Sequence, residues 1–340
     1  MALKLGTSTP SRLYKGTTEI NRAYLGANLV WNNWDFEIQI QLTAPKLTFN
    51  LVYNSGGTYT GTIYWGDGNT STNSFANRSH TYATGGTYNI KIAGQISDVS
   101  FVDTASAVYK LIAFGKETFN SISFQSCVNL STSDLKDTLK ISGTSLNNLF
   151  YGCTSITSIP FINEWDVSSV TTMVQTFRGM TNWDDSLSNW DVSNVTDFSA
   201  TFGQTSSFNT TVNAWDTSSA TNMTGMFAQS AYNKSLSNFD TSSVTNMQQM
   251  FFGSTAFNKE LDWDFSSITN MSNFMTGKSA SNYDATKYDT LLNACYNGGQ
   301  MNVTLNMGSV EYTSAASTVR NNLTSFFGGR RWTITDGGQQ

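Results

Sequence analysis

The chain has 340 residues, and only 13% of them are charged, about half of the roughly 25% that is usual for soluble globular proteins. No run of about 18 apolar residues occurs, so we expect no membrane insertion, and 19 basic against 24 acidic residues argue against nucleic-acid binding. Aromatic residues make up 13% of the chain, more than a disordered protein carries, so we expect a folded chain with an uncharged polar surface.

Residues 1–33 contain two short segments that repeat one another at a spacing of ten residues. Arg12-Leu-Tyr-Lys-Gly16 reappears as Arg22-Ala-Tyr-Leu-Gly26. Two strand–turn–strand units of this size cannot bury enough surface to be stable alone, so we expect them to dock on the next domain or on a partner. The candidate anchoring residues are Tyr14, Tyr24, Leu25 and Trp31.

The same segment carries a resemblance. Tyr24-Leu-Gly26 followed by Leu29-Val-Trp31 is similar to leader modules at the N-termini of bacteriophage virion proteins. The resemblance implies that residues 1–33 anchor the chain to other virion proteins. The sequence also starts without an apolar h-region, a cleavage site or a lipobox cysteine. Both observations favour assembly in a host cytoplasm, release by lysis and a place in the virion.

Residues 34–96 are expected to form an all-β domain. Phe36–Leu42 and Leu47–Tyr53 alternate apolar and polar residues with period two, which predicts strands. The segment then holds Gly66-Asp-Gly68, His80-Thr-Tyr82 and Gly86-Thr-Tyr88 in that order, and this order resembles a PKD-type β-sandwich. The resemblance implies a structural place for His80, the only histidine of the chain, beside the Gly66–Gly68 turn, which leaves little for general-base chemistry.

Residues 97–280 are built from repeats of 24 to 26 residues. An aromatic residue followed by Asp sets the register at Trp165, Trp190, Trp215, Phe239 and Trp263. Further apolar columns keep step, among them Met173, Phe198, Met223, Met247 and Met271, and Phe177, Phe202, Phe227, Phe251 and Met275. Units this small cannot bury their own apolar sides, so stacking unit on unit forms one continuous core.

Within one unit, Met173 and Phe177 are spaced i, i+4, which predicts a short helix. Leu187–Val192 is expected to be a strand, and together the two elements indicate a leucine-rich-repeat-like solenoid with parallel strands. Cys127 and Cys153 occupy matching positions 26 residues apart, so we expect small buried hydrophobic residues rather than reactive or metal-binding thiols.

Phe150-Tyr-Gly-Cys-Thr-Ser-Ile156 and Trp190-Asp-Val-Ser-Asn-Val-Thr196 look like the BspA-like leucine-rich repeats of bacterial surface proteins. Proteins with such repeats are mostly surface or secreted adhesion molecules, and the resemblance implies no catalytic residues. It covers roughly residues 97–280.

Residues 281–340 are expected to cap the repeats, because the last unit would otherwise expose its apolar edge. Two helices are expected, near Tyr288–Leu292 and over Tyr312–Phe327, with strands at Asn302–Asn306 and Arg331–Asp336. The predicted fold class is thus mainly β with short helices: an N-terminal β module, a PKD-like sandwich, a parallel solenoid and a mixed α/β cap.

Three functions remain open. The first is a non-enzymatic virion protein (a fibre, a tail-associated protein or a head decoration protein) whose repeats meet a glycan or protein of the host surface. The second is a bacterial cell-surface adhesin, and the third is a polysaccharide depolymerase. The sequence leaves homo-oligomerisation open, although it shows no coiled-coil heptads.

A depolymerase needs two carboxylates facing each other across a cleft. The Asp column at 166, 191, 216, 240 and 264 recurs in every unit, which is typical of turn-stabilising residues rather than of an active site. Asp67 and the Asp184-Asp185 pair lack calcium-loop spacing. We therefore expect no catalytic residue, no metal and no cofactor.

Overall fold

The computed structural model describes residues 13–15, 18–20, 22–25, 28–32 and 35–340. Strands come first as two antiparallel hairpins, which are β1 (Leu13–Lys15) with β2 (Thr18–Ile20) and β3 (Arg22–Leu25) with β4 (Asn28–Asn32). The expected strand–turn–strand form of the two N-terminal segments is therefore confirmed for these strands.

A five-stranded sheet follows, in the order β13-β5-β11-β8-β9. Its strands are β5 (Phe36–Leu42), β8 (Thr62–Tyr64), β9 (Thr70–Thr72), β11 (Gly86–Ala93) and β13 (Val108–Ala113). Every second residue of β5 is buried, as its alternation predicts, so one face of the sheet supplies a core of Phe36, Ile38, Ile40 and Leu42.

Two smaller sheets lie beside it. β6 (Thr48–Asn50) pairs with β10 (Ser79–Thr81), and β7 (Val52–Tyr53), β12 (Asp98–Ser100) and β14 (Ser121–Ser123) form a sheet of order β14-β12-β7. The one strand expected over Leu47–Tyr53 is therefore two, divided at the buried Leu51. Two 3-10 helices, η1 (Phe75–Asn77) and η2 (Val102–Ala107), connect strands.

The sheets run on past residue 97, where the sequence places the start of the repeats. β13 completes the five-stranded sheet by pairing with β5, and β12 pairs antiparallel with β7 and parallel with β14. The first turns of the repeats therefore share strands with the all-β region, and the core continues from one part into the other.

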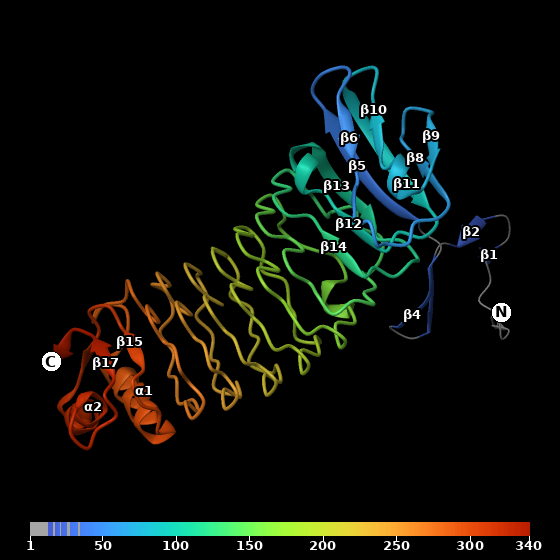
Figure 1. The fold of residues 1–340 in the computed structure, drawn as a ribbon. Coiled ribbons are helices and arrows are strands. Elements are labelled where there is room, and N and C mark those ends of the chain that lie inside the picture. The colour runs from blue at the N-terminus through green and yellow to red at the C-terminus, as the bar shows by residue number, and fades with distance from the viewer. Residues whose placement is uncertain (1–12, 16–17, 21, 26–27, 33–34) are drawn as a thin grey trace.

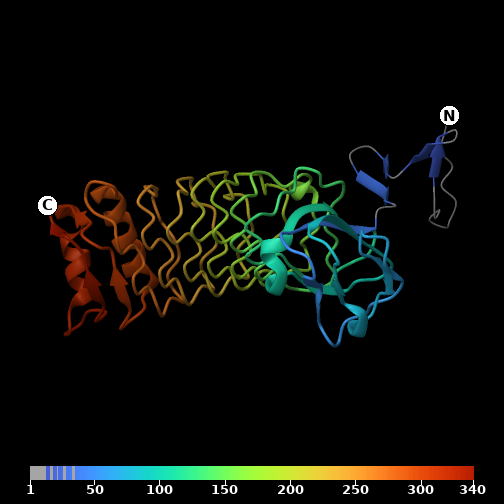
Figure 2. The ribbon, with the colours of Figure 1, turned by 90° about the horizontal axis from the view of Figure 1, so that it is seen from above.

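From β14 onward the chain forms a series of stacked turns, here called the repeat stack (residues 121–280), which Figures 1 and 2 show between the sheets and α1. Neighbouring turns meet through single parallel bridges that join Ser145, Thr172, Asp197, Asn222, Asn246 and Asn270 in succession. One further 3-10 helix, η3 (Ile162–Glu164), interrupts an early turn.

The short helix expected at Met173–Phe177 and the strand expected at Leu187–Val192 are both wrong. Gln175 has a φ of 57°, and a residue in the left-handed region stops a right-handed helix before it begins. The backbone N–H groups of Met173, Gln175 and Phe177 donate to carbonyl oxygens of the next turn instead. None of the bridges between turns falls on Leu187–Val192, so this segment has no strand partner.

Side-chain columns form the core of the repeat stack. The rings of Phe177, Phe202, Phe227 and Phe251 stack on one another with centroids 5.5 to 5.9 Å apart, within the range of favourable offset stacking. The indole Nε1–H of Trp190 donates to the Ile162 carbonyl at 2.7 Å. The repeated apolar positions are thus confirmed as core.

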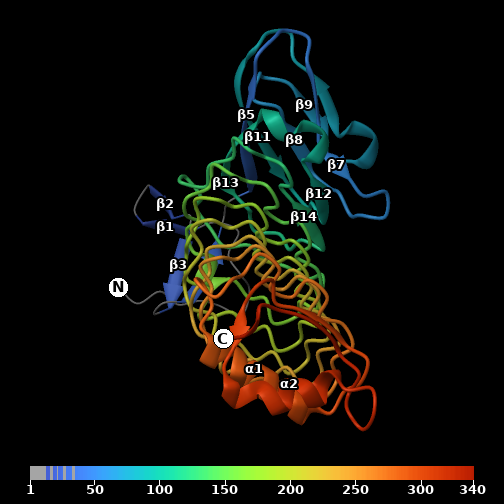
Figure 3. The same ribbon diagram turned by 90° about the vertical axis from the view of Figure 1, so that its left-hand side faces the viewer.

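The last turn leads into a mixed cap, seen end-on in Figure 3. The cap consists of α1 (Ala285–Gly298), β15 (Thr304–Asn306), β16 (Glu311–Tyr312), η4 (Ser314–Ala316), α2 (Ser317–Thr324), β17 (Thr333–Thr335) and β18 (Gly338–Gln339). A bridge from Met271 to Leu305 continues the stack into β15, which pairs in parallel with β17. Two helices and two of the strands thus follow the sequence expectation, although α2 covers only part of Tyr312–Phe327.

The buried Lys278 lies where the stack meets the cap. Its ammonium group donates to the carbonyl oxygens of Thr255, at 3.1 Å, and of Phe257, and it lies 5.8 Å from the ring centroid of Tyr283.

The chain is mainly β with a few short helices, as the sequence predicts. None of the helices in the described part of the chain has the length and apolarity that crossing a membrane demands.

Candidate functional site

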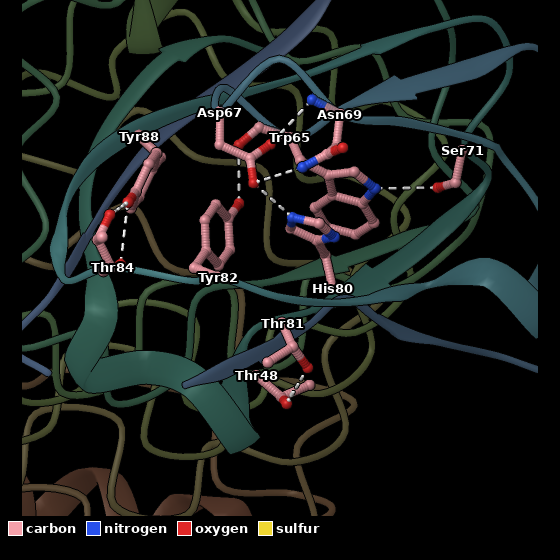
Figure 4. Close-up of polar contacts among 10 residues, drawn as sticks. All are labelled: Thr48, Trp65, Asp67, Asn69, Ser71, His80, Thr81, Tyr82, Thr84 and Tyr88. Atoms are coloured by element: carbon pink, nitrogen blue, oxygen red, sulfur yellow. Dashed lines mark hydrogen bonds and ion pairs between the residues drawn. The ribbon is translucent and has the colours of Figure 1, made fainter. Parts of the chain in front are cut away.

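The histidine of the all-β region sits in a small polar cluster at the Gly66–Gly68 turn (Figure 4). His80 Nε2 lies 2.7 Å from Asp67 Oδ2, and the imidazole stacks on Trp65 with ring centroids 5.2 Å apart. Tyr82 contacts the imidazole edge-on and donates its hydroxyl to the Trp65 carbonyl. The expected place of His80 is confirmed.

The hydrogen bonds of this cluster stabilise the ionised form of Asp67. Partial burial acts to raise the pKa of Asp67, but hydrogen bonds from His80 and from the Asn69 side chain and backbone outweigh it, and the pKa falls to about 2. Asp67 therefore stays ionised and holds the turn and the β10 strand together.

The Asp184-Asp185 pair joins neighbouring turns of the stack. Asp184 Oδ1 accepts from the backbone N–H groups of Asn209 and Thr210, at 2.7 and 2.8 Å. Asp185 accepts from Ser158, from the Ile159 N–H and from the Trp183 indole. Both carboxylates are thus engaged by the protein itself. Across the described residues, no group of three or more His, Cys, Asp or Glu side chains could hold a metal ion.

The carboxylate column has the turn-stabilising role that its regularity predicts. Each Asp accepts through Oδ1 from the backbone N–H two residues later, at 2.7 to 3.1 Å: Asp166, Asp191, Asp216, Asp240 and Asp264. Hydrogen bonds from the following Ser side chain and backbone lower the pKa of Asp166, Asp216 and Asp240. These carboxylates line one exposed edge, each bound to its own turn.

The candidate anchoring residues lie on the N-terminal hairpins. Tyr14 is in β1, Tyr24 and Leu25 are in β3, and Trp31 is in β4. Their side chains lie outside what the structure describes, so their anchoring role stays a prediction.

The two matched cysteines are core residues. Cys127 and Cys153 are both buried, and burial raises the pKa of the Cys127 thiol to about 12. The Cys153 thiol donates to the Phe124 carbonyl at 3.1 Å. Protonated, buried thiols of this kind are poor nucleophiles and poor metal ligands.

A shallow groove on the repeat stack is the feature that the sequence analysis missed. It crosses five successive turns and has a volume of about 580 Å³. Its lining residues are Ser126, Val128, Tyr151, Gly152, Thr154, Gly179, Thr181, Gln204, Ser206 and Gln229. We call this feature the stack groove.

Glycines make the hollow. Left-handed backbone recurs in two columns of the repeat stack. The column that borders the groove, four residues after the Gln175 column, holds Ser126, Gly152, Gly179, Gln204, Gln229, Gly253 and Gly277 in successive turns. Where the residue is Gly152 or Gly179, no side chain covers the neighbouring surface, and Tyr151 stays half-exposed beside them. Where it is Gln204 or Gln229, a long amide side chain forms a wall.

Three side chains along this wall are hydrogen-bonded in series. Arg178 Nε donates to Gln204 Oε1 at 3.3 Å, and Gln204 Nε2 donates to Gln229 Oε1 at 3.0 Å. The guanidinium group also lies 5.6 Å from the ring centroid of Tyr151. Because a guanidinium group can only donate, it fixes the orientation of both amides. We call this series the Arg178 relay.

A second, smaller hollow of about 240 Å³ lies where the sheets meet the first turns. Its buried carboxylate, Asp98, accepts hydrogen bonds from Ser97, Asn120 and Ser121. Burial acts to raise the pKa of Asp98, and these three hydrogen bonds outweigh that effect and lower it. Because its carboxylate is already bound by the protein, this hollow is a weaker candidate than the stack groove.

The comparisons with known proteins bear on the repeats and on the first helix of the cap. Residues 144–262 and 228–301 match a family model described as "Mycoplasma protein of unknown function, DUF285". No curated protein and no solved structure matches the chain. The two overlapping matches cover most of the repeat stack and the first helix of the cap. They support the assignment of this part of the chain to repeats of the BspA-like surface type.

Proposed function

We propose that the chain is a non-enzymatic adhesion protein whose repeat stack presents the stack groove to a ligand on a cell surface. The observation that carries the proposal is the groove itself, a shallow hollow across five turns that is lined by Ser, Thr, Gly and Gln residues together with Val128 and Tyr151. The family match supports a surface-type repeat protein.

The repeat pattern separates positions that stabilise the fold from positions in the stack groove that are free to bind a ligand. The positions that recur hold the fold: Phe202 packs in the core, and Asp216 accepts a hydrogen bond within its own turn. The groove lies where neighbouring turns differ, with glycine in one turn and glutamine in the next. Stacking thus supplies a rigid support, and the variable positions supply recognition.

The same proposal includes the finer architecture. The single parallel bridges at each turn support a leucine-rich-repeat-like solenoid over residues 97–280. The Asp67–His80 pair and the sheets around it support a PKD-like domain over residues 34–96 that acts as a spacer. Residues 281–340 would close the solenoid.

A virion setting is the second candidate. Its support is the pair of N-terminal hairpins, β1–β2 and β3–β4, each built on a Tyr-X-Gly sequence in residues 1–33. In this setting the hairpins bind other virion proteins, and the stack groove binds a host-surface glycan or protein. A bacterial surface adhesin uses the same groove with a different anchor.

The test is binding of the labelled full chain to intact bacterial envelopes. We expect saturable binding without release of reducing sugar ends from the envelope polysaccharide. Release of reducing ends would show a depolymerase and overturn the non-enzymatic assignment, and absence of binding to every envelope tested would overturn adhesion.

Immunogold labelling of purified phage particles and of bacterial envelopes separates the two settings. Regular labelling of capsid or tail supports the virion setting, with the labelled position telling decoration from receptor binding. Labelling of envelopes alone supports the bacterial adhesin.

A further inference from the structure

The stack groove has one cation at its rim and no charged residue in its described lining. The cation is Arg178, which is half-buried between Tyr151 and Gln204. A single guanidinium group beside hydroxyl and amide groups favours a polar ligand that carries a carboxylate.

The Arg178 relay has hydrogen-bond donors without an acceptor at its two ends, as far as the described residues go. Gln204 Oε1 accepts from Arg178, so Gln204 Nε2 must face Gln229, and Gln229 Oε1 must face Gln204. In the described part of the chain, neither the Nη atoms of Arg178 nor Nε2 of Gln229 has a hydrogen-bond acceptor. Both ends of the relay therefore offer donors, and a ligand rich in acceptor oxygens satisfies them.

We propose that the stack groove binds an acidic glycan, with a sugar carboxylate paired to Arg178, an acceptor oxygen on Gln229 Nε2 and a sugar ring against Tyr151. This inference rests on the proposed adhesion function and names its ligand. Neighbouring turns of paired backbone lie about 4.8 Å apart, so five turns offer a track of roughly 20 Å, enough for several sugar units.

The backbone of the groove argues against an extended peptide. A peptide that adds a strand needs unpaired N–H and C=O groups at an edge. Here the N–H groups of Gly152, Gly179, Gln204 and Gln229 all donate to the next turn, at 2.7 to 2.8 Å. Val128 is the one aliphatic residue larger than alanine in the described lining, and the groove is shallow, so it offers little apolar surface to the side chains of a peptide. Recognition is left to side-chain hydroxyls, amides and one aromatic ring, which suits a sugar polymer.

The experiment measures binding of the full chain to polygalacturonate oligosaccharides and to the same oligosaccharides after reduction of their carboxylates. A chelator is present throughout, so that calcium cannot bridge the ligand to the exposed Asp column. We expect binding to the acidic form, weakening with salt, and at least about tenfold weaker binding to the reduced form, the order expected for loss of a charge-assisted hydrogen bond.

Arg178→Gln keeps polar donors but removes the charge, and we expect about tenfold weaker binding and a smaller salt dependence. Gln229→Glu places a carboxylate at the end of the relay, and we expect it to repel the ligand. The matched control is Lys234→Gln, which removes one exposed positive charge away from the lining and leaves affinity unchanged. Thermal unfolding of each variant shows that the fold is retained.

Equal binding of the acidic and reduced oligosaccharides, or an unchanged affinity of Arg178→Gln, overturns the acidic-glycan assignment. Tighter binding of a poly-glutamate peptide of equal charge assigns the groove to a protein ligand instead. Binding to envelopes without binding to polygalacturonate overturns this inference and leaves the proposed function standing. Failure to bind either overturns both.

Discussion

The all-β region and the repeat stack solve the same problem, burial of apolar side chains, in different ways. In the five-stranded sheet, β11 pairs along its length with β5 and partly with β8, so its residues depend on contacts far apart in sequence. In the repeat stack, each turn bonds to the turn before and the turn after it. A sheet of this kind gains or loses its packing as a whole, whereas a stack distributes its stability turn by turn.

The largest effect should come from a cavity in the central column of the stack. Phe202→Ala removes a ring that stacks on Phe177, Phe208 and Phe227, and we expect a loss of about 3–5 kcal/mol. Hydrogen exchange should rise most in the two adjoining turns and fall off with distance along the stack.

The matched change in the sheet is Ile90→Ala, at a fully buried position of β11. We expect its faster exchange to spread over β5, β8 and β11 together. A uniform rise over the whole chain in both variants would show that the sheets and the stack unfold as one cooperative unit, which contradicts the comparison.

The second effect tests the Asp67 carboxylate, which is hydrogen-bonded to His80 and Asn69. The pKa of Asp67 is lowered in the folded state, so the carboxylate stabilises the fold above its unfolded pKa of about 3.9, and this contribution is lost as the pH falls toward 2. We expect Asp67→Asn to cost about 1 kcal/mol at pH 7, because Asp67 is an exposed residue and solvent screens its carboxylate. The check is thermal unfolding from pH 7 to pH 2, over which the wild type and the variant should converge. A pH-independent difference would mean that the Asn69 and His80 bonds do not depend on the charge.

The third effect separates hydrogen bonding from ring packing in the stack. Trp190 and Trp165 are almost equally buried, but Trp190 Nε1 donates to the Ile162 carbonyl whereas Trp165 Nε1 has no partner in the described structure. Trp190→Phe should therefore destabilise more than Trp165→Phe, by about 1 kcal/mol. Chemical denaturation of both variants measures the difference, and equal losses would assign the cost to ring volume alone.

The smallest effect concerns the exposed carboxylate column. Asp216→Asn keeps the acceptor for the Ser218 N–H and removes the charge that raises the pKa of Asp240. We expect a change within about 0.5 kcal/mol, stabilising at low salt and absent at high salt. A loss of more than about 1 kcal/mol would show that the charge itself holds the turn.

The parts of the fold that were predictable are those with a simple period. Alternation over Phe36–Leu42 predicts β5, and matched apolar positions such as Phe177 and Phe202 predict the core of the stack. The helix at Met173–Phe177 fails because a turn with a left-handed residue at Gln175 brings the same two side chains inward. An i, i+4 spacing of apolar residues indicates which residues are buried. It does not indicate whether the backbone between them is helical or contains a left-handed residue.

The stack groove escaped prediction for a related reason. It depends on missing side chains at Gly152 and Gly179 next to long ones at Gln204 and Gln229. Alignment of the repeats on their apolar columns does not show this difference between glycine and glutamine. The sequence does show it in the column that borders the groove, where Ser, Gly, Gly, Gln, Gln, Gly and Gly occupy successive turns.

The direction of the turn-to-turn bonds has a consequence for how such a molecule can change length. In the left-handed column that borders the stack groove, every backbone N–H from Gly152 through to Gly253 donates to a carbonyl oxygen of the following turn. The two faces of any turn are therefore unlike, and each interior turn presents the same pair of faces to its neighbours. Insertion or deletion of one whole unit leaves both ends of the stack with the partners they already had. The length of the repeat stack can therefore change by about 4.8 Å for each repeat added or removed, while the residues at its two ends stay the same.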